Sequence, residues 1–242
     1  MKKTLFIVLI AFCARPVLAQ FSDSLRYYAG FTSTGTYNRT NASYYYLFNN
    51  ALKLSAQKKS MSYNFFNKWL YGQKDDQLTN NDLFSNFDIN LHKTFPHFYY
   101  WGLFSYTSAF SLKINNQLQS GGGIAYNIIE QKRTILNLSY GLLYDYSDIL
   151  RDTLRKRYEL VRHSFRIKIK WGIGTRLSFS GNAFYQPGVR DYTDYIIRSE
   201  ATLSLKVKKW LSLTASMNYN EMSRTRAQNL FMTYGLVIEN YY

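Results

Sequence analysis

The stretch from residue 161 to residue 171, read as VRHSFRIKIKW, constrains the fold of this chain more than any other. Val161, His163, Phe165 and every second residue after them are mostly apolar, whereas the residues between them are polar or cationic. Successive side chains of a β-strand point to opposite faces, so the pattern predicts a strand with one apolar and one cationic face. About ten residues of such alternation is the length of a tilted strand that crosses a membrane.

The same alternation recurs along the chain and predicts about twelve strands. Their expected ranges are 27–38, 43–57, 60–72, 82–93, 98–114, 117–129, 134–146, 161–171, 176–186, 195–208, 211–220 and 230–242. No repeat, linker or low-complexity tract divides them, so we expect one domain over residues 20–242. The predicted fold class is all-β, an antiparallel outer-membrane barrel of about twelve strands.

The connections between these strands alternate in length. Those after even-numbered strands are short, at 58–59, 94–97, 131–132, 172–175 and 208–209. Those after odd-numbered strands are longer and more polar, at 73–81, 147–157, 188–194 and 223–229, with a tight turn at Asn115 and Asn116 as the exception. Short turns on one rim and long loops on the other are typical of bacterial outer-membrane barrels with both termini in the periplasm.

Alternation alone does not decide which face lies inside, because a soluble barrel with an apolar interior has the same period. About twelve strands would enclose a space too wide for side chains to fill with a dry core. The polar face is rich in Gly, Ser, Thr, Asn and charge, which suits a wet interior, and the 23 Tyr and 17 Phe suit aromatic girdles. We therefore predict the apolar face outside, with a soluble β-sandwich as the alternative.

The first nineteen residues have the order of a secretory signal peptide. Lys2 and Lys3 precede an apolar run over residues 5–14, and small residues before Gln20 mark the expected cleavage site. A retained anchor helix is the alternative, but the apolar run is too short for it. Cys13 is the only cysteine, so the mature chain is expected to carry no disulfide, thiol nucleophile or thiolate metal site.

The balance of 30 basic to 15 acidic residues gives a net charge of +15, which favours anionic partners. Export argues against nucleic acid among them. The basic residues expected on the inner, polar face form a hypothetical anion path: Lys53, Lys68, Lys113, Arg162, Arg166, Lys168, Lys170, Arg198 and Lys206. Glu200 is a candidate acidic partner. A solvated, salt-bridged interior explains the same residues without any anion path.

The cations at 151, 155–157, 224 and 226 are expected on the outer rim, where phosphates of lipopolysaccharide could pair with them. The three histidines at 92, 97 and 163 fall on different strands or turns, and no spacing indicates a catalytic group, metal site or cofactor. In a strand, His163 and Ser164 face opposite sides and cannot form a base and nucleophile pair.

Gly121, Gly122 and Gly123 lie inside a predicted strand, where they indicate a bend or close backbone approach rather than a phosphate loop. The segment SGGGIAYNII, which contains these glycines, and the later segment LNLSYGLLYDY resemble the uncharacterised outer-membrane barrel family that includes the salt-induced outer-membrane protein. Gly121, Gly123 and Tyr126 match the glycines and the aromatic of its motif, and the resemblance covers roughly residues 98–242. It implies an outer-membrane barrel without established catalytic residues.

These observations predict an integral outer-membrane protein with a passive, non-enzymatic role, either in envelope structure or as a narrow pore for small solutes, with anions favoured. The alternatives are a barrel hydrolase that acts on lipid or peptide at the outer rim, and a barrel that docks a surface or periplasmic partner. The terminal aromatic Tyr242 resembles the signal read by the outer-membrane assembly machinery, which is therefore an expected partner.

Overall fold

The computed structural model describes residues 27–40, 42–58, 60–95, 97–131, 133–151, 154–208 and 211–238. In these ranges the chain is all-β. The strands are β1 (Tyr27–Arg39), β2 (Tyr44–Lys58), β3 (Met61–Lys74), β4 (Gln77–Phe95), β5 (Phe98–Ala109), β6 (Ile114–Glu130), β7 (Thr134–Arg151), β8 (Leu154–Ile173), β9 (Leu177–Pro187), β10 (Tyr195–Lys208), β11 (Leu211–Met222) and β12 (Ala227–Ile238). The expected signal peptide and the terminal Tyr242 lie outside the described residues. None of the described segments forms a helix long and apolar enough to cross a membrane.

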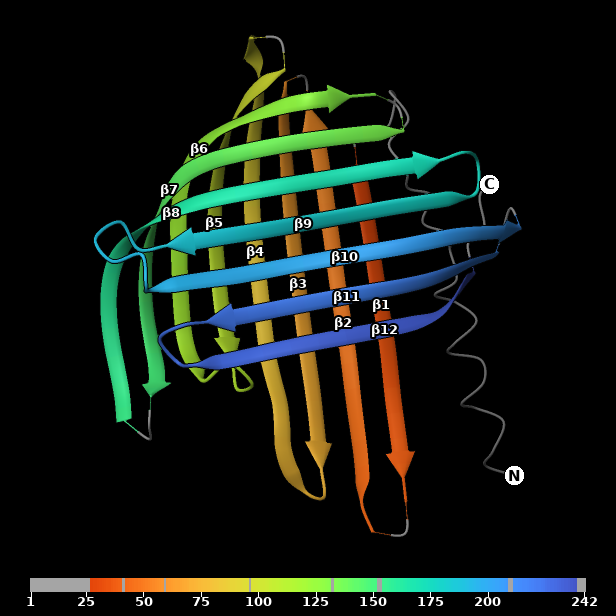
Figure 1. Cartoon of the computed structure of the whole chain (residues 1–242), viewed down its shortest axis with the longest axis vertical. Helices are drawn as coiled ribbons and strands as arrows, with labels where there is room; N and C mark the ends of the chain where they lie inside the picture. Colours follow the sequence, from red (N-terminus) through yellow and green to blue (C-terminus); the bar gives the residue numbers. More distant parts are fainter. Residues whose placement is uncertain are drawn as a thin grey trace, which may run out of the picture.

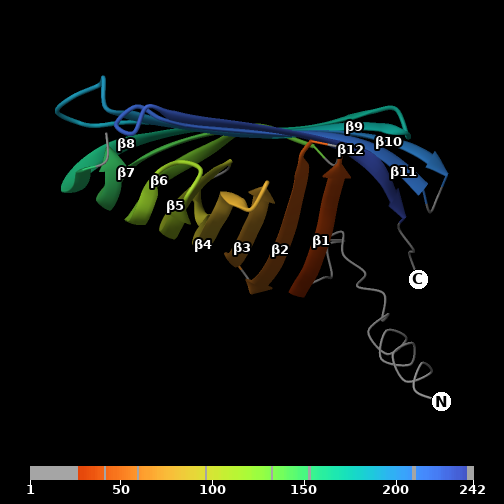
Figure 2. The ribbon, with the colours of Figure 1, turned by 90° about the horizontal axis from the view of Figure 1, so that it is seen from below.

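All twelve strands form one antiparallel sheet in sequence order, with each strand paired to the next along the chain. Figure 1 shows the antiparallel strands β1 to β5 aligned roughly vertically and β9 to β12 crossing them roughly horizontally, while β6, β7 and β8 curve from one set to the other. The view in Figure 2 shows the two sets as opposed layers around an interior. Among the described residues the sheet is not closed, since β1 and β12 share no backbone pairing.

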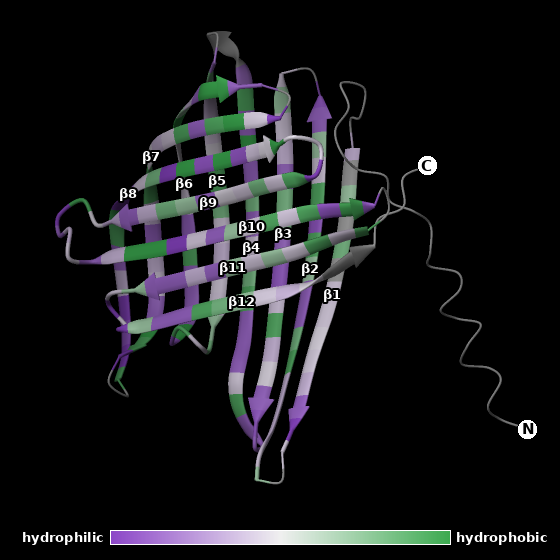
Figure 3. Ribbon diagram, turned by 45° about the vertical axis from the view of Figure 1, so that its right-hand side comes forward, coloured by the Kyte–Doolittle hydropathy of each residue, from purple (hydrophilic) through white to green (hydrophobic). Residues whose placement is uncertain are grey.

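The apolar side chains lie on the outer face and the polar ones on the inner face. Leu54, Leu138, Ile167 and Leu213 are exposed although they are large and apolar, whereas polar residues on the opposite faces of the strands, such as Gln117, are buried. The resulting alternation is visible as green and purple bands along the strands in Figure 3. A soluble barrel or sandwich would place its large apolar residues inside, so the prediction of an outward apolar face is confirmed.

The glycine run Gly121 to Gly123 lies inside β6 and pairs with β7. A Cβ atom built on Gly121 would lie 2.0 Å from the carbonyl oxygen of Leu142, and one on Gly123 would lie 2.1 Å from that of Tyr140. Only glycine permits β6 and β7 to approach so closely. Of the two alternatives predicted for this run, the close backbone approach is confirmed.

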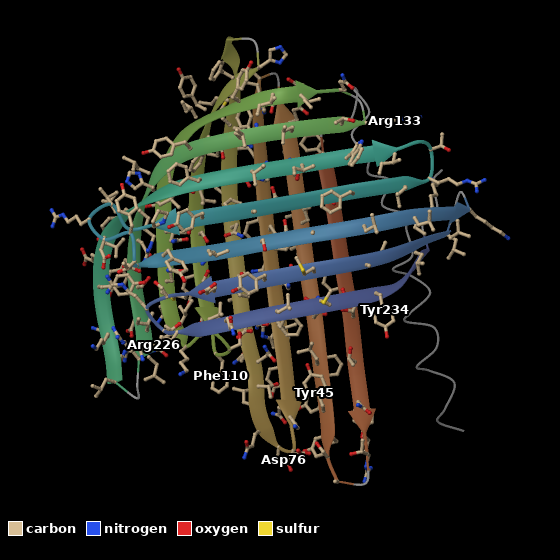
Figure 4. All side chains as sticks on the ribbon, in the orientation of Figure 1. Tyr45, Asp76, Phe110, Arg133, Arg226 and Tyr234 are labelled. Atoms are coloured by element: carbon tan, nitrogen blue, oxygen red, sulfur yellow. The ribbon has the colours of Figure 1, made fainter. Side chains whose placement is uncertain are left out.

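The turns lie on two opposite rims. Figure 4 shows Asp76, Phe110 and Arg226, from turns after odd-numbered strands, on one side, and Arg133, from a turn after an even-numbered strand, on the other. We call these sides the odd rim and the even rim. Most of the predictions of long loops at the odd rim are wrong, because the strands continue through those segments.

The segment 73–81 is a hairpin in which only Asp75 and Asp76 leave the strands, both with positive φ. The segment 147–157 lies almost entirely in β7 and β8, and 223–229 forms a turn at 223–226 followed by the start of β12. The tight turn predicted at Asn115 and Asn116 is also wrong, since both residues lie in β6 and the turn is at 110–113. These segments contain runs of consecutive polar or charged residues, so hydrophobic alternation does not reveal that they are strands.

Candidate functional site in the polar interior

The basic residues predicted for the inner face do not share one environment. Lys113 lies in the exposed turn between β5 and β6, with a positive φ, and not on a strand face. The others occupy polar-face positions on four strands: Lys53 on β2, Lys68 on β3, Arg162, Arg166, Lys168 and Lys170 on β8, and Arg198 and Lys206 on β10. Arg162 is buried, Lys68, Arg166, Arg198 and Lys206 are half-buried, and Lys53, Lys168 and Lys170 are exposed.

Arg162 is the centre of a buried ion network near the odd rim. Arg162 and Asp145 are both 0% exposed and form an ion pair through Nε and a carboxylate oxygen. The guanidinium of Arg162 also donates to Asp194 Oδ1 at 3.0 Å and to the carbonyl oxygen of Asp194 at 2.9 Å. Arg224 donates to the second Asp194 oxygen at 2.6 Å. A buried charge is stable only when it is paired and hydrogen-bonded, and both conditions are met here.

The network reaches across the interior to strands that are not neighbours in the sheet. Arg198 on β10 donates to Gln117 Oε1 on β6 at 2.8 Å, and Gln117 Nε2 donates to Asp145 at 3.1 Å. Deeper in the interior, Gln119 Nε2 donates to Gln186 Oε1 on β9 at 3.3 Å. Side chains of the two layers therefore meet directly in this half of the interior.

An apolar cluster adds to this packing at the odd rim. Its buried members come from β5, the turn after it, β6, β7, β10, β11 and β12: Ala109, Leu112, Ile114, Ile149, Ile196, Met222 and Ala227. Beside the cluster, Asn229 on β12 donates to Ser111 Oγ at 3.1 Å, and Ser111 donates to the buried Asp82 at 2.7 Å. Because these elements belong to both layers of the folded sheet, their packed side chains fill the interior at this rim.

The half of the interior near the even rim is open and cationic. Lys168 and Lys170 are exposed on the inner face, and Arg166 is half-buried. Arg166 donates to Asn182 Oδ1 at 3.0 Å, and Asn182 Nδ2 donates to Glu200 Oε1 at 3.0 Å. Glu200, the acid expected to neutralise the cations of β8, is thus connected to Arg166 through the side-chain amide of Asn182 on β9.

A serine and a histidine also meet in this half. Ser62 Oγ lies 3.3 Å from His92 Nε2, and Asn90 Nδ2 donates to Ser62 Oγ at 3.2 Å. A hydroxyl beside an imidazole is the minimum for an activated nucleophile. Among the described residues no carboxylate accepts a hydrogen bond from His92, and no group of three potential metal ligands is present. Sequence reasoning missed this contact because it depends on the register of β3 and β4, which includes an irregularity after Gly72.

The other two histidines lie outside the interior. His163 is on the outer face, where its Nδ1 is 2.9 Å from the Tyr140 hydroxyl and its ring stacks on Tyr192 at 5.9 Å. Such a cluster is typical of the aromatic girdle at a membrane interface. His97 is exposed in the turn after β4, where its Nδ1 lies 3.5 Å from a carboxylate oxygen of Glu130.

Several cations predicted for the outer rim are already paired with acids of the chain. Asp148, near the tip of the β7–β8 hairpin, accepts hydrogen bonds from Arg155 at 2.8 Å and from Arg157 at 3.1 Å. The hydrogen bond from Arg155 is the main cause that holds the pKa of Asp148 far below its usual range. Arg224 pairs with Asp194. Lys156 and Arg226 are exposed at this rim.

Comparison with known proteins places this arrangement in context. A family model described as "Protein of unknown function, DUF481" matches residues 32–231. No curated protein sequence matches the chain. The link to the salt-induced outer-membrane protein stays a prediction, because the matching family is described only as one of unknown function.

Solved structures with a similar fold are membrane barrels. The chain is similar to the NanC porin, with a TM-score of 0.51 and 9% identity, over 89% of this chain and 100% of that chain. It also matches the translocator domain of autotransporter NalP from Neisseria meningitidis, with a TM-score of 0.49 and 12% identity, over 88% of this chain and 87% of that chain. At such identities the likeness to the porin concerns the fold alone: twelve antiparallel strands arranged as in an outer-membrane barrel.

Proposed function

This chain belongs to the DUF481 family of proteins of unknown function, and we propose that it is an integral β-barrel of the bacterial outer membrane with a passive, non-enzymatic role. In this role its cationic interior draws in small anionic solutes. The observation that carries the proposal is the inversion of the fold, with large apolar side chains exposed on the outer face and charged side chains inside. A hydrocarbon environment stabilises the exposed apolar side chains, and a wet interior stabilises the charged ones.

The outer face supports a place in the membrane. Leu138, Leu142, Ile167 and Leu213 are exposed on β7, β8 and β11, and the exposed aromatic ring of Tyr192 lies in the odd-rim loop between β9 and β10. In water, so large an exposed apolar surface would favour aggregation. The outward side chains would instead be covered by lipid, with the aromatic rings near the polar headgroups.

The interior supports solute attraction more than free passage. Exposed Lys168 and Lys170 favour anions at the even rim, whereas packed side chains around Arg162 fill the interior at the odd rim. A narrow pore would require that packing to open. Planar-bilayer recordings would detect such a pore by its conductance, and a role in binding or envelope structure predicts none.

Reconstitution into lipid vesicles tests the membrane assignment. The protein is expected to resist extraction by alkaline carbonate and to migrate faster on a gel before heating than after it. A chain that folds and stays monodisperse without detergent or lipid would contradict the assignment. The same protein with Arg166, Lys168 and Lys170 replaced by Gln should still insert, because these residues do not face lipid.

We also propose two sets of partners. The exposed Lys156 and Arg226 would pair with lipopolysaccharide phosphates at the odd rim, and the outer-membrane assembly machinery would read the aromatic residue Tyr242. Replacing Lys156 and Arg226 with Gln should weaken binding to vesicles that contain lipopolysaccharide more than binding to neutral vesicles. Deleting Tyr242 should slow assembly without changing the folded protein.

A barrel hydrolase is the second candidate, because Ser62 and His92 lie within contact distance on the inner face. Their position differs from the outer rim expected for such an enzyme. In that case purified protein would hydrolyse ester substrates, and Ser62→Ala and His92→Ala would each abolish the activity. If both variants hydrolyse the ester substrates as fast as the parent protein, Ser62 and His92 are excluded as the source of the activity.

A further inference from the structure

We propose that the interior is a basin, closed at the odd rim and open at the even rim, which binds a small multivalent anion of the phosphate type. This inference rests on the proposed barrel function and deepens it. Strand β8 shows the shape of the basin most directly. Along its inner face, Arg162 and Ser164 are buried, Arg166 is half-buried, and Lys168 and Lys170 are exposed.

Other strands follow the same order of burial. On β4, Asp82 is buried, Asp88 is half-buried and His92 is exposed. On β9, Gln186 is buried, while Ser180 and Ser178 are exposed. The gradient is therefore shared by β4, β8 and β9, which come from opposite layers of the sheet, whereas Asn137 on β7 and Ser212 on β11 are buried near the even rim. Along β4, β8 and β9, solvent reaches the inner face near the even rim and is excluded toward the odd rim.

The floor of the basin is built from contacts that join the two layers. Arg198 reaches Gln117 at 2.8 Å, and Arg162 joins Asp145 on β7 to Asp194 before β10. Behind these polar contacts lies the apolar cluster around Leu112 and Met222. Ions are poorly solvated among apolar side chains, so a charged solute that reaches the floor would stop there.

The walls above the floor carry an excess of cations. Lys168 lies within electrostatic range of Arg166 and Lys170 on its own strand and of Lys53 on β2, with Asp88 as the acid that opposes them. In the part of the chain that the structure describes, neither Lys168 nor Lys170 forms an ion pair with a carboxylate. Alternate residues of a strand are only about 6.6 Å apart, so these cations repel one another until an anion lies between them.

Neutral donors surround the same cations. The register places Asn182 opposite Lys168 and Ser180 opposite Lys170 on β9. Amide and hydroxyl groups can donate to the oxygens of an anion that the lysines attract. A compact anion with several charged oxygens would satisfy more of these groups than chloride or a single carboxylate, which is why the phosphate type is favoured.

Titration calorimetry with pyrophosphate, on the full mature chain folded in detergent without added lipid, tests the basin. We expect saturable binding at one site that weakens as salt is added. Lys168→Gln together with Lys170→Gln should weaken binding at least about tenfold. The matched control, Lys156→Gln with Arg190→Gln, removes the same charge from exposed positions at the odd rim and should change affinity less than about twofold.

Three results separate the inference from the proposed function. If the parent protein inserts into vesicles but does not bind pyrophosphate, or if both double variants lose affinity equally, the basin is refuted and the barrel stands. A steady conductance of the parent protein in planar bilayers would refute the closed floor. Failure to insert into vesicles would refute the barrel itself. Heat-dependent gel migration of each variant would show whether it is folded.

Discussion

Replacement of Arg162 by Met is expected to destabilise the folded barrel by about 3–5 kcal/mol. Met has a similar length and keeps most of the packing, so the loss comes from the charge. Arg162 is fully buried, and its guanidinium holds both Asp145 and Asp194, which are 0% and 5% exposed. Without it, the carboxylate of Asp145 would remain buried with hydrogen bonds from Gln117 and Ser147 but without a cation.

The two acids are not equally affected. Asp194 keeps the hydrogen bond from Arg224 at 2.6 Å, whereas the ion pair of Asp145 among the described residues is with Arg162. The double variant Arg162→Met with Asp145→Asn removes the uncompensated charge together with its partner. It should therefore regain at least about half of the stability that the single variant loses, as is usual when a buried pair is removed as a unit.

Urea unfolding in phospholipid vesicles, followed by Trp fluorescence, measures both effects. Lys168→Gln is the matched control, since it removes a cation from the same face of β8 where the side chain is exposed. Its cost should be below about 1 kcal/mol. If Arg162→Met costs no more than Lys168→Gln, or if the double variant is less stable than the single one, the buried network does not stabilise the fold.

Three further predictions concern other parts of the molecule. Leu213→Arg places a charge on the outer face and should cost about 2–4 kcal/mol in vesicle unfolding, whereas Thr214→Arg on the inner face should cost far less; equal losses would mean that the faces are assigned wrongly. Gly123→Ala should destabilise the barrel by at least about 1–3 kcal/mol, because the new methyl group would meet the carbonyl oxygen of Tyr140 at 2.1 Å; an unchanged urea midpoint would argue against the close approach. The lowered pKa of Asp148 means that its stabilising effect is present above about pH 4 and is lost as the pH falls. Asp148→Asn should therefore lower the urea midpoint at pH 7 and reduce the difference between pH 7 and pH 3, and an unchanged difference would contradict this account.

The sequence by itself determined the strands and their faces. A period of two is a local property, so the alternation in stretches such as 134–146 and 211–220 predicts both a strand and its two faces. Strand number and the polar character of the inner face then favour the inverted arrangement, because so wide a barrel cannot have a dry core. The close backbone approach at Gly121 to Gly123 was also predictable, since a glycine run inside a strand has few other uses.

Hairpin length could not be determined in this way. Alternation loses its contrast where consecutive residues are polar or charged, as in residues 73–77 and 155–157 near the tips of the β3–β4 and β7–β8 hairpins. The two strands of each hairpin extend into those segments because their backbones pair with each other. Backbone pairing depends on register and turn geometry, which hydropathy does not report.

Only the tertiary structure decided what each charged residue does. Arg162 and Lys168 occupy equivalent positions in the alternation of β8, yet one is buried among acids and the other is exposed. The difference arises because β7 and the segment before β10 place acidic and carbonyl partners beside Arg162, and because the apolar cluster lies beyond them. Ser62 and His92 likewise meet through the register of two strands. Contacts across an interior depend on how a sheet curves and closes upon itself, and that is a property of the whole chain.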